Sequence, residues 1–288
     1  MNGFLLVDKP SGMTSHDVVA KIRKRFGTKK VGHAGTLDPM ATGVLVLGLG
    51  VATRLLPYIT DGRKAYEGSI RLGAATHTDD REGDVMSTTD ASEVSDEAIR
   101  AGLAAMVGTI MQRPSSVSAI KVDGKTAHQR VREGEVVDLP AREVTIESIE
   151  IKQINRVGEF VDIDVVVHCS AGTYIRSIAR DLGDALKVGG HLTALRRTLV
   201  APFTIEECGE YESAEPVSVV DGINRVLPVR ELTFDEMREI SFGRQLVANP
   251  EGSVYAGIGP DGDFAALITN KEFGGKTLAT PIMVAVKE

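Results

Sequence analysis

One stretch decides how this 288-residue chain folds: Gly32-His33-Ala34-Gly35-Thr36-Leu37-Asp38-Pro39-Met40-Ala41-Thr42-Gly43. It is polar and rich in glycine, and an uncharged, apolar run at residues 44–50 follows at once. A short run of this kind is typical of a buried strand. A glycine-rich loop that leads into such a strand can bring its backbone close to a ligand. The sequence therefore predicts a ligand-facing loop here.

Only two side chains in this loop can titrate, His33 and Asp38. Pro39 follows Asp38 and pushes its backbone away from helical geometry. A carboxylate held rigidly on a loop can serve as a nucleophile or a general base. Asp-Pro also opens many ordinary turns, so the dipeptide alone permits a purely structural role. The choice between these two interpretations depends on the wider motif.

The wider motif resembles that of a known family. Gly-His-Ala-Gly-Thr-Leu-Asp-Pro, followed by Ala-Thr-Gly, is similar to the catalytic motif of the bacterial tRNA pseudouridine synthase B (TruB) family. Eight consecutive residues of this composition are a specific signal. In that family the aspartate is the catalytic residue and the histidine enters the RNA loop. The resemblance therefore implies that Asp38 is catalytic and that His33 binds substrate.

The phrase Asp-Lys-Pro-Ser-Gly-Met-Thr-Ser at residues 8–15 also resembles the opening of the family. From its residues alone the segment is a turn and a helix cap, with Lys9 expected near RNA phosphate. The resemblance supplies the expected roles of two further residues. Tyr66 would stack on the flipped uracil and take part in proton transfer, whereas an ordinary strand tyrosine would pack against a cross-strand neighbour. Asp80 would help to hold the site. The carboxylates around Asp80 lack the ligand spacing of a metal site.

Arg176 is the predicted partner of Asp38. Residues 169–183 have the pattern of a strand end, a glycine loop and a helix start, which puts Arg176 in the first helical turn. A cation is unfavourable there because of the helix dipole, so it needs a carboxylate. A guanidinium beside Asp38 would keep that carboxylate ionised and aimed. The resemblance pairs the same two residues, and an ion pair of Arg176 with another carboxylate is the alternative.

Two apolar or aromatic residues complete the expected base pocket. In the resembled family a tyrosine two positions before the arginine lines the pocket, which corresponds to Tyr174. The leucine of a Leu-Arg-Arg element touches the substrate base, which corresponds to Leu195. Leu195 would be a core residue in most proteins, and the two roles are compatible.

Composition narrows the class of protein. Cys169 and Cys208 give neither a disulfide framework nor metal-ligand spacing. The sequence contains no apolar run long enough for a membrane span and no evident signal peptide. The expectation is a cytoplasmic enzyme that uses no metal or cofactor, has no membrane contact, and works as a monomer without an obligate protein partner.

The charges of the chain give conflicting indications of whether it binds nucleic acid. The formal net charge of −7 argues against an RNA-binding protein. Six basic residues and no acidic one lie between Lys21 and Lys30, directly before the Asp38 motif. This basic segment, residues 21–30, is either a phosphate-binding patch or an ordinary solvated helix face.

The order of elements predicts an α+β (mixed α/β) protein with two domains. Residues 1–228 resemble a pseudouridine synthase catalytic domain with a central, mostly antiparallel sheet, in which residues 112–142 resemble an RNA-clasping thumb. Residues 229–288 resemble a small, β-rich RNA-binding domain of the PUA type. Locally, we expect Ser15 to cap the first helix and Pro57 to break a short helix over residues 53–59.

The resemblance implies that the protein is a tRNA pseudouridine synthase acting on the T-arm stem-loop. It would isomerise the T-loop uridine at position 55 by an aspartate-dependent mechanism with base flipping. Asp38 would attack ribose or base, or abstract a ribose proton. A glycoside hydrolase would need a second carboxylate near Asp38, such as Asp80, and Arg176 argues against it. A non-catalytic RNA-binding protein would keep the basic segment and tolerate loss of Asp38.

Overall fold

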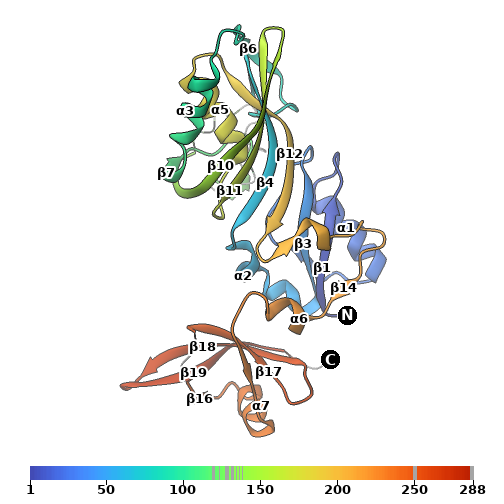
Figure 1. The fold of residues 1–288 in the computed structure, drawn as a ribbon. Helices are drawn as coiled ribbons and strands as arrows, with labels where there is room; N and C mark the ends of the chain where they lie inside the picture. The colour runs from blue at the N-terminus through green and yellow to red at the C-terminus, as the bar shows by residue number, and fades with distance from the viewer. Residues whose placement is uncertain are drawn as a thin grey trace.

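The computed structural model describes residues 1–118, 121–122, 124–126, 130, 133, 135, 137, 139–248 and 252–285. Much of the predicted thumb at residues 112–142 therefore lies outside the described residues. Figure 1 shows a large sheet with helices α3 and α5 at one end and a smaller sheet at the other. Among the described residues no helix is both long and apolar enough to cross a membrane.

In the described part of the chain the large sheet has ten strands. Its main path is β14 (Pro216–Val217), β1 (Gly3–Lys9), β3 (Thr42–Leu49), β12 (Gly190–Val200), β4 (Lys64–Leu72), β11 (Phe160–Cys169), β10 (Arg142–Val157) and β7 (Gly108–Gln112), with β2 (Val31–His33) on β3 and β13 (Phe203–Thr204) on β12. Its strand pairs are antiparallel except for β12 with β3. The predicted mixed fold with a mostly antiparallel sheet is confirmed.

Strand β3 is buried on both faces, which explains its continuous apolar run. Leu45 and Leu47 pack with helix α1 (Ser15–Phe26) in one cluster. Val44 and Val46 point the other way, into a second cluster. A strand covered on both sides has no solvent face, so its sequence shows no alternation.

The other half of the sheet is covered on one face only. Helices α3 (Asp96–Ala104) and α5 (Ile175–Ala185) pack on the apolar side of β4, β11 and β10, and Figure 1 shows these helices together. On the opposite face Asp162 pairs with Arg71 at 2.7 Å, and Asp164 accepts from Ser69 at 2.5 Å. One polar face produces the alternation seen along β11.

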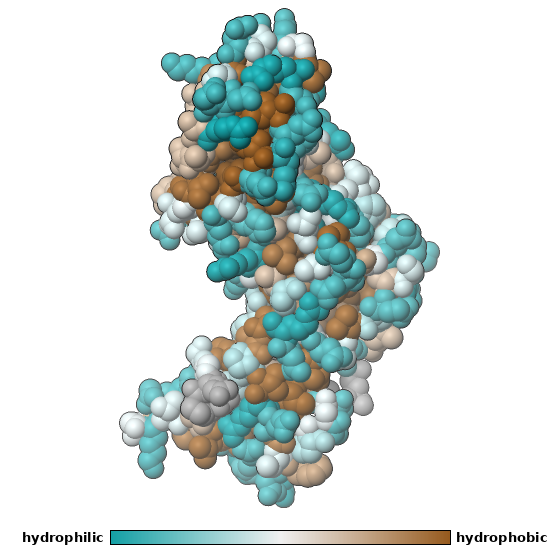
Figure 2. Space-filling view, viewed as in Figure 1, coloured by the Kyte–Doolittle hydropathy of each residue, from teal (hydrophilic) through white to brown (hydrophobic). Residues whose placement is uncertain are grey.

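The small sheet has five strands and begins directly after Pro228. Its order is β15 (Val229–Glu231), β17 (Val254–Ile258), β18 (Phe264–Phe273), β19 (Lys276–Val284) and β16 (Leu246–Val247), with helix α7 (Phe234–Ser241) beside it. Phe264 and Met283 belong to the same buried cluster as Phe4 and Phe203 of the large sheet. Figure 2 shows apolar residues gathered where the two sheets meet. The two sheets are therefore packed against each other.

Two local predictions are wrong in detail. Thr14, not Ser15, is the N-cap of α1, because Thr14 and Asp17 form a capping box. Pro57 does not break a helix but lies in the first turn of α2 (Leu56–Thr60), where its missing N–H costs nothing. The remaining elements are η1 (Gly50–Arg54), β5 (Ala74–Thr76), β6 (Val85–Thr88), β8 (Lys121–Val122), β9 (Lys125–Thr126), η2 (Ile205–Glu207) and α6 (Val219–Ile223).

Gly43 provides a test of how closely β3 and β12 pack. Its φ is 103°, and a Cβ there would lie 2.1 Å from the carbonyl oxygen of Arg197. We expect Gly43→Ala to lower the free energy of unfolding by roughly 2–5 kcal/mol, from backbone strain plus the clash. Gly27→Ala is the control, since Gly27 also has positive φ (61°) but its Cβ would meet nothing within 4 Å. Urea unfolding would show a loss of about 1 kcal/mol for the control, and equal losses would contradict the packing argument.

Candidate active site

Side chains from distant segments hold the loop that carries Asp38. The Ser15 hydroxyl accepts from the N–H of Leu37 at 2.8 Å. Arg197, on β12, donates to the carbonyl oxygen of Gly35 at 3.1 Å and, from Nε, to that of Val44 at 2.8 Å. Ser15 and Arg197 are both buried. The loop is therefore fixed at several points, which is the rigid presentation expected of a catalytic carboxylate.

Lys9 lies elsewhere than the predicted position near RNA phosphate. It is fully buried, and its Nζ donates to the carbonyl oxygens of Met13 at 2.6 Å, Pro10 at 2.8 Å and Pro39 at 3.3 Å. Burial lowers the pKa of Lys9 to about 8. These three carbonyl oxygens engage all three N–H donors of the ammonium group. It braces the turn next to Asp38 instead.

Arg176 holds Asp38 in a two-pronged ion pair. Its Nε lies 3.0 Å from Oδ2 of Asp38, and its Nη2 donates to Oδ1 at 3.2 Å. The same guanidinium donates to the carbonyl oxygens of Thr78 at 2.8 Å and Val117 at 2.9 Å. The Arg176 side chain is 6% exposed and the Asp38 side chain 33% exposed. Bidentate pairing fixes direction as well as charge, so the reachable carboxylate is aimed from behind.

Asp80 supports Arg176 and does not face solvent. Its Oδ2 lies 3.3 Å from Nη1 of Arg176, and its side chain is 3% exposed. Its Oδ1 accepts from the Thr78 hydroxyl at 2.5 Å and from the N–H of Glu82 at 3.0 Å. Arg180, one turn further along α5, pairs with the neighbouring Asp79 at 3.3 Å. Two arginines on one helix thus dock this polar loop, and this geometry fits the supporting role predicted for Asp80.

Burial and charge act in opposite directions on Asp38. Burial raises the pKa of the Asp38 carboxyl above its ordinary value, and the neighbouring charge of Asp80 adds to the rise. The guanidinium of Arg176 opposes both, with smaller contributions from Lys9 and Arg197. Without the guanidinium the desolvated carboxyl would favour its protonated form, which cannot act as nucleophile or base.

A cavity of about 320 Å³ opens at Asp38. Five of the predicted site residues line it: Asp38, Tyr66, Tyr174, Arg176 and Leu195. Among the described residues that line it, Asp38 is the only carboxylate. The described part of the chain also shows no group of three or more His, Cys, Asp or Glu side chains placed to hold a metal ion. Because one carboxylate alone lines the described part of the cavity, a glycoside hydrolase that uses two carboxylates is a poor fit.

Two tyrosines and a leucine form the walls of this cavity. Tyr66 on β4 lies opposite Arg197 of β12 in the strand register. Burial raises the pKa of Tyr66 and the nearby Arg197 opposes the rise, so the phenol is protonated at neutral pH. Arg142 lies over the ring of Tyr174, with 5.1 Å from its Cζ to the ring centroid. These rings and the nearly buried Leu195 offer flat, apolar surfaces to a planar base.

His33 lies outside this cavity, in a neighbouring groove of about 600 Å³. Lys29 and Lys30 line the same groove. Thr60 lines both the groove and the cavity at Asp38, so the two adjoin. The ring of His33 meets that of His16 edge-on at 5.3 Å, and burial lowers the pKa of His33. A mostly neutral imidazole therefore lies beside a basic groove next to the site.

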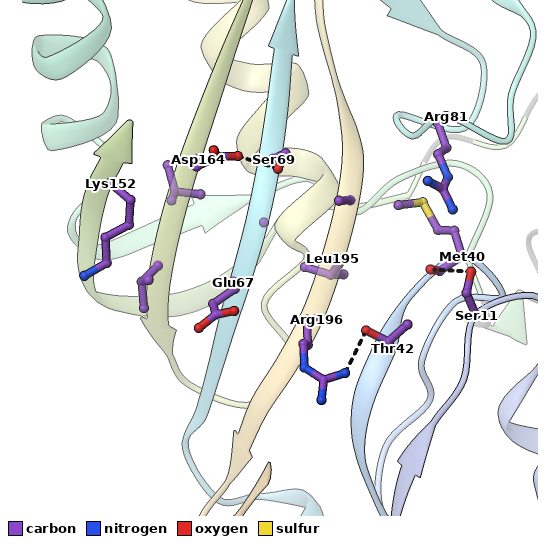
Figure 3. Close-up of a pocket in the computed structure, with 14 residues that line it drawn as sticks. Ser11, Met40, Thr42, Glu67, Ser69, Arg81, Lys152, Asp164, Leu195 and Arg196 are labelled. Atoms are coloured by element: carbon purple, nitrogen blue, oxygen red, sulfur yellow. Dashed lines mark hydrogen bonds between the residues drawn. The ribbon is translucent and has the colours of Figure 1, made fainter. Parts of the chain in front are cut away.

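A third cavity, of about 450 Å³, has Glu67 and Asp164 among its lining residues (Figure 3). Side chains alternate along a strand, so Glu67 lies on the face of β4 opposite to Tyr66. Arg196, also in this cavity, is paired with Asp8 at 2.7 Å. The carboxylates of this third cavity therefore lie on one face of the sheet, and the cavity at Asp38 lies on the opposite face.

Sequence reasoning missed two charged residues that line the cavity at Asp38, Lys64 and Arg197. Arg197 is 1% exposed and ties the Asp38 loop to β12. Each of these two residues lies two positions from a residue that the motifs singled out. Lys64 comes two positions before Tyr66, and Arg197 comes two positions after Leu195. Because side chains two apart share a strand face, this spacing was the signal that could have found them.

Known proteins resemble the chain over most of its length. The descriptions TruB family pseudouridylate synthase (N terminal domain) and tRNA pseudouridylate synthase B C-terminal domain match residues 23–175 and 176–216. The tRNA pseudouridine synthase B of Corynebacterium efficiens is 54% identical over 284 residues, which are 97% of this chain and 95% of that protein. The tRNA pseudouridine synthase B of an Arthrobacter species is 51% identical over 299 aligned positions, and the alignment covers 99% of this chain and 96% of that protein.

Solved structures agree with these sequence matches. A chain in the crystal structure of the archaeal box H/ACA sRNP Nop10-Cbf5 complex superposes with a TM-score of 0.68 at 25% identity, covering 98% of this chain and 85% of that one. A chain in an H/ACA RNP bound to a substrate RNA containing 2′-deoxyuridine gives 0.66 at 25% identity, covering 98% and 84%. The chain therefore belongs to the TruB family of tRNA pseudouridine synthases, which makes it an isomerase of uridine.

Proposed function

We propose that this enzyme converts the T-loop uridine at position 55 of tRNA to pseudouridine, with Asp38 as the catalytic carboxylate. The observation that carries the proposal is the only carboxylate among the described residues of a cavity with aromatic walls, a carboxylate that a buried guanidinium holds. A cavity of about 320 Å³ suits one nucleoside. Relatives named tRNA pseudouridine synthase B support the substrate class.

The proposed reaction rearranges the uridine without changing its atoms. The bond between N1 and the ribose C1′ breaks, the uracil turns, and a bond forms between C5 and C1′. A proton leaves C5 and one arrives at N1. Asp38 acts on the reacting nucleotide, and Arg176 keeps it ionised and aimed. Tyr66 and Leu195 hold the uracil ring, and the Tyr66 phenol serves the proton transfer.

Access to the uridine requires base flipping, which costs a few kcal/mol. His33, in the groove next to the cavity, would fill the place that the flipped base leaves in the RNA stack. Lys29 and Lys30 in the same groove would hold RNA phosphates. The predicted PUA-like domain at residues 229–288 would add further RNA contacts. The same proposal describes a cytoplasmic monomer that needs no protein partner.

Asp38→Asn tests the catalytic assignment. The amide keeps the shape of the side chain but can be neither nucleophile nor base, so turnover of unmodified tRNA should fall below detection. Binding of tRNA should change by less than about threefold, because affinity rests on other contacts. Mapping of pseudouridine at position 55 gives the readout, with a tRNA carrying cytidine there as control. Substantial turnover by the folded variant would exclude Asp38, and free uracil in place of pseudouridine would favour a hydrolase.

A double-mutant cycle tests the pairing of Asp38 with Arg176. Removing either partner leaves the other charge partly buried without its counter-charge. Each of Asp38→Asn and Arg176→Met should therefore lower the free energy of unfolding by about 2–4 kcal/mol. The double variant should lose less than the sum of the two, by about 1 kcal/mol or more. Thermal or urea unfolding of the four proteins provides the measurement. Strict additivity would mean that Arg176 is stabilised mainly by Asp80 and the two carbonyl oxygens.

The basic groove predicts how the affinity for tRNA depends on salt concentration. Lys29→Gln with Lys30→Gln should weaken tRNA binding and reduce the slope of log affinity against log salt by about 1.5, because two phosphate contacts are lost. A charge-matched pair, Lys152→Gln with Lys187→Gln, is the control. Titration of labelled tRNA at several salt concentrations would measure both. An unchanged slope in the Lys29/Lys30 variant would identify the segment as an ordinary solvated surface.

A further inference from the structure

Lys64 lines the catalytic cavity and has no role in the proposed chemistry. It opens strand β4, two residues before Tyr66, and its side chain is nearly buried at 7% exposure. Its Nζ donates to the carbonyl oxygens of Thr60 at 2.6 Å and Gly62 at 2.9 Å. The cation is therefore held at the wall of the cavity by the chain segment that leads out of α2.

The ammonium group of Lys64 has three N–H donors, and these two carbonyl oxygens use two of them. Among the described residues no carboxylate forms an ion pair with it. The other cations of the cavity are differently placed: Arg176 is engaged by two carboxylates, and Arg197 by backbone carbonyl oxygens. A nearly buried cation that lacks a counter-ion is costly, and an anionic ligand would remove that cost.

We propose that Lys64 binds a phosphate oxygen of the RNA backbone beside the flipped uridine and is thereby a substrate-positioning residue. The inference rests on the proposed function, because it takes the RNA as the source of the anion. Phosphate is the only charged group of that substrate. A flipped nucleotide swings about its two flanking phosphates, so one of them comes to the mouth of the pocket. Thr60, whose carbonyl oxygen holds Lys64, lies where the cavity and the Lys29/Lys30 groove adjoin.

The protonation state of Lys64 predicts how RNA binding should depend on pH. Burial lowers the pKa of Lys64 to about 8, the positive charge of Arg197 lowers it further, and Asp61 and Cys169 raise it. The Cys169 thiol has a pKa raised to about 11 and Tyr66 has a raised pKa, so both are neutral near pH 8. In the free enzyme Lys64 is cationic below about pH 8 and loses its charge as the pH rises through that value. Phosphate binding by Lys64 should weaken over the same interval.

Lys64→Gln is the first test, because the amide can still donate to both carbonyl oxygens while the charge is lost. Losing a charged hydrogen bond should raise KM for unmodified tRNA at pH 7 roughly tenfold or more, with a smaller effect on kcat. The salt slope of tRNA binding should fall by about 0.8. Lys152→Gln is the matched control, since Lys152 lies by the cavity on the other face of the sheet (Figure 3) and pairs with Glu150. It should leave KM within twofold and the salt slope unchanged.

Lys64→Arg is the second test and keeps the inference falsifiable if the glutamine variant unfolds. Arginine stays charged, so the rise of KM above pH 8 seen with the unaltered enzyme should disappear in this variant. An unchanged KM and salt slope in a folded Lys64→Gln protein would overturn the inference, as would the same alkaline rise in Lys64→Arg. Failure of the proposed function would look different: the unaltered enzyme would then form no pseudouridine at position 55, whatever residue 64 is.

Discussion

The site depends on one ion pair in which the two partners have unequal access to solvent. Arg176 is buried and saturated with acceptors, whereas Asp38 is open to the cavity on one side. A buried guanidinium is tolerable only with its carboxylates, and a desolvated carboxyl stays ionised only with its guanidinium. The rest of the architecture follows from this requirement. Helix α5 must begin beside Asp38, and the polar loop with Asp80 must dock onto that helix.

The features that could be predicted from sequence are those that local physics or a specific motif determines. The continuous apolar run of β3 and the alternation of β11 report directly how many faces of each strand are buried. The pairing of Asp38 with Arg176, which lie 138 positions apart, could be predicted because a cation at a helix start needs a counter-charge. Its bidentate geometry and the contact of Asp80 with the same guanidinium emerged only in three dimensions.

The errors and omissions have equally physical causes. Thr14 and Ser15 are both good N-caps, and the capping box with Asp17 decided between them. Lys9 looked like a surface lysine because nothing in a sequence marks three carbonyl oxygens that converge on one point. Lys64 and Arg197 were overlooked because a charged residue in a strand is usually on the wet face. Here both lie on the buried face, where the cavity admits them.

The bonds from Arg197 to the Asp38 loop also fix when during protein synthesis a working site can exist. The arginine that holds Gly35 is translated 162 residues after it. At typical rates of synthesis the loop therefore waits on the order of ten seconds or more for its support. During that time the start of β3, at Thr42 and Gly43, lacks its pairing with β12, whereas the end of β3 already has β2 beside it. A nascent chain therefore cannot hold Asp38 as the finished protein does until Arg176 and Arg197 have both been made.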